Sequence, residues 1–437
     1  MTVKLIELVD HNLCVRDADG VLARSPGFCS IANKDPLFGE AARQLARLQP
    51  RHTFNQFWSQ LSLDPLPLKT PLFRHHADMA YGHLRELTQG LDLEEGVVLG
   101  VPSNYSRTQL AVLLGVVKQS NFTQLGLVDL ALLQALATPA DECIVIELQL
   151  HQAVLTRLRR SDGHLVKDTM AQVPAAGMIA LQDAYTNVIT DEFLRQSRFD
   201  PKHNAETEQY LYNQLDSWIA QARDNPEVLI DINHKGLTFQ ARLTLEHFIK
   251  RGSNVFARIE RELQQLRTPE TALHIRTSQL QLPGLTAVLG GVIAVDDAQL
   301  MTHCLAQLDN IKSPPEAPRF VTRLPLTQAN PEQATTARGL PTHVVWEYKA
   351  IPLPLGRLGF GSQLGDLPLA RLVPVDDLPG ALVIERQSRN IVLELKTTAP
   401  VSRNGQPVTS GTPLQLGDTL LVGEARRPLQ LIQVEQG

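Results

Sequence analysis

The sequence contains few cysteines and no long apolar run. The cysteines are Cys14, Cys29, Cys143 and Cys304, far apart and mostly in apolar segments. Without a CxxC pair or a Cys/His cluster, this pattern favours buried thiols in a reducing compartment over a metal site. No apolar stretch of about 18 residues occurs, so we expect neither a signal peptide nor a membrane span. The default expectation is a cytoplasmic protein, in a bacterial cytoplasm.

An excess of positive charge is also missing. The formal net charge is −5 and the pI is near 6.2, so no global basic field favours nucleic acid or anionic lipid as a partner. Hydrophobic residues make up 43% and charged residues 20% of the 437 residues, which is typical of a globular protein. The length suggests two to three domains.

Glycine is absent from two turns where a phosphate-binding protein would need it. Residues 5–12 and 144–151 each read as an apolar strand that runs into an acidic residue and a turn. This is the pattern of a nucleotide-binding β-hairpin. Residues with a Cβ are restricted at positive φ and hold phosphate oxygens farther from the backbone N–H groups. The central question is therefore whether the chain is an enzyme or retains only the fold of one.

The first 310 or so residues alternate between strand and helix patterns, which indicates a layered α/β domain. A Pro-, Thr- and Gln-rich stretch follows and is typical of a linker. From Val344 onward only short strand patterns occur, separated by Gly, Pro and Asn, as in a small β-sandwich. We therefore expect domains at 1–311 and 343–437, joined by a linker at 312–342. Helices are expected at 36–48, 77–89, 106–120, 130–137, 177–223 (broken at Asp200-Pro201) and 243–266.

Several segments, in order, resemble the ATPase domain of DnaK-type heat-shock chaperones, which belong to the actin-like superfamily. The resemblance covers about 300 residues and implies two lobes, each built on a five-stranded sheet, that close on ATP. The segments are 25–42, 99–106, 191–201, 282–285 and 295–298.

At the positions that the family uses for chemistry, this chain departs from the pattern. The family's two Asp-Leu-Gly hairpins become Glu7–Asn12 and Glu147–Gln152, which keep an acid but not the glycines. Asp10 places an acid where the family has a neutral threonine, and it would repel a phosphate tail. Trp58 falls where the family has its catalytic lysine, so stabilisation of the transferring phosphoryl group would be lost.

Two interpretations of the surviving acids stay open. Glu7, Asp129 and Glu147 either form a magnesium–water shell or are ordinary acids at strand ends. If the protein is active, the resemblance makes these three its catalytic residues. If a nucleotide binds, it implies contacts from Asn12, Glu147, His151, Thr277 and Ser278, the last two replacing the family's adenosine-side glycines. His11 with His151 lacks a third ligand, so we expect no metal site.

The C-terminal segment resembles a forkhead-associated (FHA) domain. The similarity lies in segments 358–362, 381–386, 404–408 and, most specifically, 413–423. The positions that read phosphothreonine in that family are altered, here at Gly359-Phe360, 378–381 and 397–399. Phosphate recognition needs charge-assisted donors. Arg357, Arg386 and Arg389 are the candidate substitutes, and the alternative is that they are solvated surface charges.

These observations predict a non-catalytic, chaperone-like scaffold or assembly protein, a pseudoenzyme that acts through protein–protein interactions with unidentified protein partners. No cofactor is expected. The alternative is a divergent ATPase of the actin-like superfamily, for which ATP with magnesium would be the cofactor. Two further alternatives are a peptide-binding chaperone, disfavoured because no helical lid follows, and an actin-like filament former.

Overall fold

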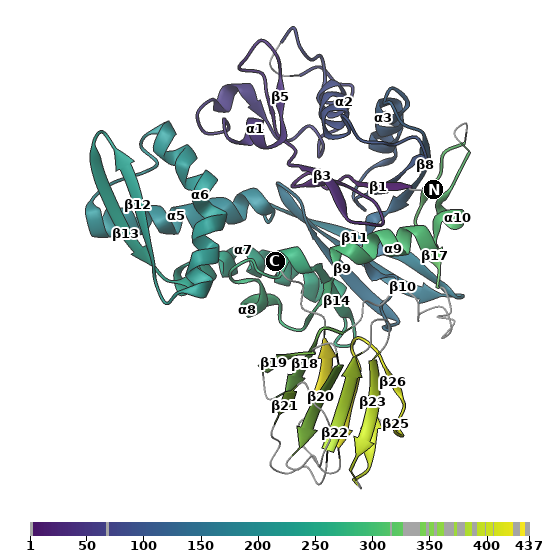
Figure 1. Cartoon of the computed structure of the whole chain (residues 1–437). Helices are drawn as coiled ribbons and strands as arrows, with labels where there is room; N and C mark the ends of the chain where they lie inside the picture. The colour runs from purple at the N-terminus through teal and green to yellow at the C-terminus, as the bar shows by residue number, and fades with distance from the viewer. Residues whose placement is uncertain are drawn as a thin grey trace. The chain divides into compact units, whose positions relative to one another are not determined.

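The computed structural model divides the chain into two compact units, residues 1–326 and 327–437, and each is described by itself. The first unit is mixed α/β and the second is built from strands (Figure 1). The residues that the structure describes are 3–66, 70–314, 317–326, 341–346, 349–353, 356–361, 371–373, 381–386, 391–397, 399–404, 406–422 and 429–432.

The first unit contains two six-stranded sheets. In the first sheet the strand order is β16-β8-β7-β1-β2-β3. The strands from β16 to β1 run parallel to one another, and β1, β2 and β3 are connected as antiparallel hairpins. Strand β1 carries Leu5 and Ile6, both fully buried, because the sheet is covered on both faces. The strands are β1 (Lys4–Glu7), β2 (Leu13–Arg16), β3 (Val21–Ser25), β7 (Val97–Val101), β8 (Gln124–Asp129) and β16 (Phe320–Val321).

The second sheet repeats this arrangement in the order β15-β14-β9-β10-β11-β17. Strands β9, β14 and β15 are parallel, and β9, β10 and β11 form antiparallel hairpins. The strands are β9 (Glu142–Leu148), β10 (Gln152–Ser161), β11 (His164–Pro174), β14 (Ala272–Arg276), β15 (Val292–Val295) and β17 (Arg323–Pro325).

Ten helices occur among the described residues, all in the first unit. Helix α3 begins as its sequence predicts: Ser106 is the N-cap and forms a reciprocal capping box with Gln109. None of the described helices is long and apolar enough to cross a membrane. They are α1 (Gly39–Arg43), α2 (His76–Leu87), α3 (Arg107–Lys118), α4 (Leu130–Ala135), α5 (Met178–Ser197), α6 (Ala205–Asp224), α7 (Leu245–Leu266), α8 (Leu285–Leu289), α9 (Asp297–Ala306) and α10 (Leu308–Ile311).

A two-stranded hairpin of β12 (Val228–His234) and β13 (Leu237–Leu243) packs against α5 and α6 (Figure 1). Its apolar side chains alternate, so that Val228, Ile230 and Ile232 are buried while their neighbours are exposed. They join a core with the helices α5, α6 and α7. The predicted break at Asp200-Pro201 separates α5 from α6, as the proline requires.

Two sequence predictions differ from the structure. The helix expected at 36–48 is only α1, because Leu37 and Phe38 form strand β5, which pairs with β4 (Cys29–Ser30) beside β6 (Thr53–Phe54). Tertiary strand pairing overrides the local helix pattern there. The expected linker at 312–342 contains β16 and β17, which add one strand to each sheet, and the first unit extends to Leu326.

The second unit consists of strands in two sheets, ordered β19-β18-β28-β27-β24-β25 and β21-β20-β22-β23-β26. Val344 and Leu431 from one sheet share an apolar core with Leu358, Phe360 and Ile384 from the other. The strands are β18 (His343–Trp346), β19 (Lys349–Pro352), β20 (Gly356–Gly361), β21 (Arg371–Val373), β22 (Ala381–Arg386), β23 (Ile391–Lys396), β24 (Val401–Arg403), β25 (Gln406–Pro407), β26 (Pro413–Leu414), β27 (Thr419–Val422) and β28 (Leu429–Ile432).

Candidate functional site

The two sheets of the first unit bring their chemistry-bearing strand ends together. Because β1, β7 and β8 are parallel, Glu7 and Asp129 end at one edge of the first sheet. Glu147 and Arg276 likewise lie at one edge of the second sheet, on β9 and β14. We call the place where these ends and the turns 8–12 and 149–151 contact one another the hairpin junction.

Glu7 is held between two arginines. It is 1% exposed, and its carboxylate accepts a hydrogen bond from Nε of Arg16, which lies on β2, the neighbouring strand of the same hairpin. Its Oε2 lies 2.5 Å from Nη2 of Arg276, at the end of β14 in the other sheet. Burial alone would raise the pKa of Glu7, but the charges of Arg276 and Arg16 outweigh it and lower the pKa below its ordinary value. Both carboxylate oxygens are therefore committed to guanidinium groups.

Asp10 joins the two hairpin turns directly. Its Oδ1 accepts a hydrogen bond of 2.7 Å from the backbone N–H of Leu150 in the second turn. The side chain is 4% exposed, and burial raises its pKa to about 6 although the backbone N–H of Leu150 favours the charged form. A side-chain carboxylate thus occupies a backbone N–H of the kind that a phosphate-binding turn would offer to its ligand.

The second turn is seated on the N-terminus of α5. The backbone N–H groups of Met178 and Ile179 donate to the carbonyls of Gln149 and Leu150, both at 2.9 Å. These are N–H groups that no residue of the helix itself can satisfy, and α5 has no side-chain cap. A Cβ on Gly177 would lie 2.4 Å from the carbonyl oxygen of Gln149, so glycine is required for this close approach. The anion-binding end of the helix is consequently filled by the turn.

Asp129 at the end of β8 is neutralised by a lysine of the second sheet. Lys167 on β11 places Nζ 2.9 Å from Oδ2 of Asp129 and donates to the carbonyl of Ser103 at 2.6 Å. The Ser103 hydroxyl donates to Oδ1 at 2.5 Å, and the N–H of Ala131 donates to the same oxygen at 3.1 Å. Asp129 is fully buried, so its charge is compensated by Lys167 and these donors.

Glu147 is buried, and no cation among the described residues forms an ion pair with it. Nε2 of Gln149 donates to its carboxylate at 2.9 Å, and the amide of Gln149 pairs with the amide of Asn104 through two bonds of 2.9 and 3.1 Å. Burial raises the pKa of Glu147 to about 7, partly offset by the hydrogen bond from Gln149 and by the charge of Arg276. Burial therefore favours the protonated form of Glu147 near neutral pH more than it would for an exposed carboxyl.

His11 and His151, the two histidines of the hairpin turns, have different surroundings. Nε2 of His151 lies 3.2 Å from the carbonyl of Asn55 and 3.1 Å from its side-chain oxygen. His11 is desolvated, and burial lowers its pKa to about 4. Within the described part of the chain, no group of three or more His, Cys, Asp or Glu residues has the arrangement of a metal site.

The remaining nucleotide-contact candidates lie around a cavity of about 200 Å³ beside the junction. Asn12 and Ser278 line it, together with Arg16, Arg24 and Arg276. Thr277 instead donates its hydroxyl to the carbonyl of Val295 at 3.1 Å. The cavity is smaller than the roughly 300–1,000 Å³ of pockets that hold drug-sized ligands.

Trp58 lies in the hydrophobic core of the first sheet. It is 1% exposed, and its Nε1–H donates to Nδ1 of His83 at 3.0 Å. Because that nitrogen accepts, neutral His83 carries its proton on Nε2 and donates it to Ser25 Oγ at 2.7 Å. Trp58 therefore has a packing role.

The residues of the junction do not fit ATP with magnesium. A magnesium shell needs carboxylate oxygens or their bound waters, yet Glu7 is bonded to two arginines and Asp129 to Lys167. A phosphate cradle needs free backbone N–H groups, and the N–H of Leu150 is bonded to Asp10. Binding would require these buried ion pairs to break, which typically costs about 3–5 kcal/mol for a pair that loses one partner.

A further contact joins the segment after α1 to the helices α5 and α6. Nη2 of Arg47 lies 3.0 Å from Oδ1 of Asp183 on α5, and its guanidinium stacks 3.9 Å above the ring of Tyr212 on α6. The backbone N–H of Arg47 donates to Gln209 at 2.8 Å. This set of bonds ties the α1 segment to the second sheet's helices at a point separate from the junction.

The sequence interpretation missed the cations of the junction. Arg16 ends a fully buried strand, and Arg276 ends another apolar strand. A charged residue inside an apolar strand pattern is itself a signal, because such a charge is rarely buried without a partner. Lys167, within an exposed-looking strand, carries no comparable signal.

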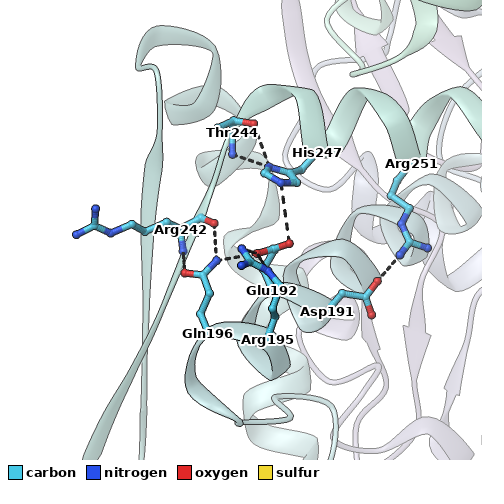
Figure 2. Close-up of polar contacts among 8 residues, drawn as sticks. All are labelled: Asp191, Glu192, Arg195, Gln196, Arg242, Thr244, His247 and Arg251. Atoms are coloured by element: carbon cyan, nitrogen blue, oxygen red, sulfur yellow. Dashed lines mark hydrogen bonds and ion pairs between the residues drawn. The ribbon is translucent and has the colours of Figure 1, made fainter.

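A second polar cluster, on α5, β13 and the start of α7, has a structural role (Figure 2). Gln196 exchanges two hydrogen bonds of 2.9 Å with the backbone of Arg242 and thereby satisfies the edge of β13. Glu192 accepts from Gln196 at 2.7 Å and from Nε of Arg195 at 3.0 Å. His247 caps α7 through Thr244, and Figure 2 shows its ring turned toward Glu192, 3.9 Å away.

In the second unit, the described arginines that were candidate phosphate readers are engaged within the unit. Arg357 pairs with Glu385 at 3.2 Å and with Glu394 at 3.7 Å, across three neighbouring strands. Arg386 donates to the carbonyl of Leu353 at 2.9 Å. Arg389 and residues 378–380 lie outside the described residues.

No protein-family model matches the chain, and no curated protein matches its sequence.

Proposed function

We propose that this chain is a non-catalytic scaffold or assembly protein, whose first unit retains a two-lobed, actin-like ATPase architecture of the DnaK type without its reaction. The observation that carries the proposal is the pairing of Glu7 with Arg16 and Arg276. Guanidinium groups of the chain itself stand where a phosphate-binding protein would need open backbone and free carboxylates. Because the protein's own charged groups occupy this site, we infer that natural selection has acted on surfaces that contact other proteins and not on a ligand-binding pocket.

The second unit is in keeping with this function. Its fold is proposed to be an FHA-like sandwich in which phosphothreonine recognition has been lost. Arg357 balances two glutamates of its own sheet, so its charge is already compensated. In each unit, described side chains that were candidates for contacting a phosphorylated ligand are paired within the protein, as Glu7 is with Arg276 and Arg357 with Glu385. This supports a role in binding protein partners through surfaces, in the cytoplasm.

The alternative function, a divergent ATPase, has less support. Glu147 is the only one of its three acids without an ion pair in the described residues. The other two, Glu7 and Asp129, are paired with cations of the protein itself. The chaperone alternative depends on partners that nothing in the chain identifies.

A turnover assay distinguishes the two functions. Purified full-length chain is incubated with ATP and magnesium, and released phosphate is compared between the parent and Glu147→Gln. We expect both to release phosphate at the background rate. Hydrolysis by the parent that Glu147→Gln abolishes would establish the ATPase and end the scaffold proposal.

A further inference from the structure

The cavity beside the hairpin junction carries an excess of positive charge. Its wall contains the guanidinium groups of Arg16, Arg24 and Arg276 and one carboxylate, that of Asp297. Asp297 lies 3.5 Å from Arg276, and Glu7 stands behind the wall, bonded to Arg16 and Arg276. Glu147 also acts on Arg276, but its pKa is raised to about 7, so near neutral pH it offsets only part of a charge. Three cations therefore outweigh the anions around them, and positive charge remains in excess.

That charge is best assigned to Arg24. Arg24 lies on β3, where it is exposed, and it forms no ion pair with the residues that the structure describes. The side chains of Arg16 and Arg276 are 3% and 11% exposed, so the cavity extends from buried guanidinium groups to an accessible one. Arginine presents its donors in a planar fork that matches an oxyanion.

Two residues that line the cavity each carry a buried side-chain atom without a hydrogen-bond partner among the described residues. These atoms are Oε1 of Gln279, a residue that is 4% exposed, and Nδ1 of His11. The His11 ring donates to the backbone carbonyl of Leu148, so in the neutral ring Nδ1 is an acceptor. An unsatisfied buried acceptor costs free energy unless a ligand or water supplies a donor.

A ligand that pairs with all of these groups must accept hydrogen bonds from the arginines and donate hydrogen bonds to Gln279 and His11. Hydrogen phosphate does both, since it carries charged P–O acceptors and at least one P–OH donor at neutral pH. Sulfate has the same size and shape but no donor at that pH. The cavity of about 200 Å³ admits a small anion and excludes a nucleoside triphosphate.

We infer that this cavity is a binding site for inorganic phosphate or for the phosphate group of a compact monoester, held by Arg24, Arg16 and Arg276 and recognised by Gln279 and His11. No bond is made or broken in this binding. The site is independent of the proposed scaffold function, because it lies beside the junction and does not need the junction to open.

The test is a calorimetric titration of the full-length chain at pH 7 and matched ionic strength, with inorganic phosphate, glycerol phosphate, sulfate and acetate as separate probes. We expect saturable phosphate binding with a Kd of about 1 mM or tighter. Sulfate and acetate should bind at least tenfold more weakly. Glycerol phosphate binding as well as phosphate would identify a monoester site, and weaker binding would identify inorganic phosphate as the ligand.

Three variants accompany the titration. Arg24→Gln changes an exposed residue, so the protein should fold, and phosphate affinity should fall about tenfold or more. Gln279→Leu should reduce the preference for phosphate over sulfate. Arg261→Gln, an exposed arginine on α7 away from the cavity, should bind phosphate like the parent.

The inference is overturned by absent saturation with phosphate, by equal affinity for sulfate, or by unchanged affinity in Arg24→Gln. Equal affinity for sulfate would mean that only charge attracts the anion. Failure of phosphate binding would leave the scaffold proposal standing, since that proposal is tested with ATP.

Discussion

The carboxylate of Asp10 accepts a hydrogen bond of 2.7 Å from the backbone N–H of Leu150, 140 residues away. One side chain thereby links the turn of the first hairpin to the turn of the second, at the position where each turn would face a shared ligand. Together with the ion pairs of Arg16 and Arg276 with Glu7, it joins the two sheets where their strand ends meet.

Replacing Asp10 should separate the roles of its charge and its hydrogen bond. Asp10→Ala leaves the buried N–H of Leu150 without a partner, so we expect a loss of about 1–3 kcal/mol in the free energy of unfolding. Asp10→Asn keeps an acceptor and removes a desolvated charge, so it should be neutral or stabilising at pH 8. Urea unfolding at pH 8 measures both, and equal losses in the two variants would contradict the account.

Replacing Arg276 should show how much the buried ion pairs contribute to the free energy of unfolding of the first unit. Arg276→Met leaves Glu7 with one cation, and we expect the first unit to lose about 3–5 kcal/mol. Urea unfolding is followed by tryptophan fluorescence in a Trp346→Phe background, because Trp58 and Trp218 then report on the first unit alone.

The double variant Glu7→Gln with Arg276→Met is the internal check. In Arg276→Met the buried Glu7 carboxylate lacks one of its two cationic partners. The double variant removes that carboxylate charge as well, so it should recover part of the lost free energy of unfolding. Arg261→Met, on the exposed face of α7, serves as the matched control and should change stability by less than about 0.5 kcal/mol. A loss below about 1 kcal/mol in Arg276→Met would show that the pair does not hold the sheets together.

Glu147→Gln should stabilise the protein at high pH. A carboxyl whose pKa is raised from 4.5 to about 7 binds its proton more tightly in the folded state. Its contribution is therefore favourable at low pH and is lost as the pH rises from about 4.5 through 7, with roughly 3 kcal/mol lost above pH 7. The variant lacks this titration, so its advantage over the parent should be largest at pH 8 and shrink toward pH 5.

The difference between the parent and Glu147→Gln, measured by urea unfolding from pH 5 to 8, cancels the titrations of other groups. Glu142→Gln is the control with the opposite sign, because the hydrogen bond from Arg157 lowers the pKa of Glu142. Its cost should persist to pH 8. If the difference in free energy of unfolding between Glu147→Gln and the parent does not change with pH, the pKa of Glu147 is not raised by burial and the account is wrong on this point.

Arg47→Ala should loosen the α1 segment without unfolding the unit. The side chains of Arg47 and Asp183 are 31% and 44% exposed, so the ion pair contributes about 1 kcal/mol or less to global stability. We expect faster amide exchange in residues 43–49 and unchanged exchange in the two sheets. Arg43→Ala is the control, because the ion pair that Arg43 forms among the described residues is local, with Glu40, and its attraction to Asp216 on α6 acts at longer range. It should change that exchange less than Arg47→Ala does, and a similar increase in both variants would contradict the link to α5.

Local signals in the sequence predicted much of the fold, and others were present but unused. The cap of α3 at Ser106 follows from the pattern Ser-x-x-Gln, and the break between α5 and α6 follows from Pro201. The hairpin of β10 and β11 turns at Asp162-Gly163, both with positive φ, which is a strong hairpin signal that the sequence interpretation did not use.

The ion pairs of the hairpin junction could not be predicted from local sequence patterns. The missing glycines indicated that a phosphate cradle was absent, and this is a property of two short turns. The ion pairs observed at Glu7 depend on β2 and β14 lying on opposite sides of it, although Arg16 and Arg276 are 260 residues apart in the chain. Such a contact follows from the arrangement of two sheets and has no periodicity to reveal it.

The most direct test of the central claim is a calorimetric titration of the full-length protein with ATP and magnesium. The account predicts no saturable heat, because Arg16 and Arg276 occupy Glu7 and Asp10 occupies the N–H of Leu150. Binding with a Kd tighter than about 100 µM would contradict it, since such a nucleotide would have to displace these buried bonds and still gain free energy.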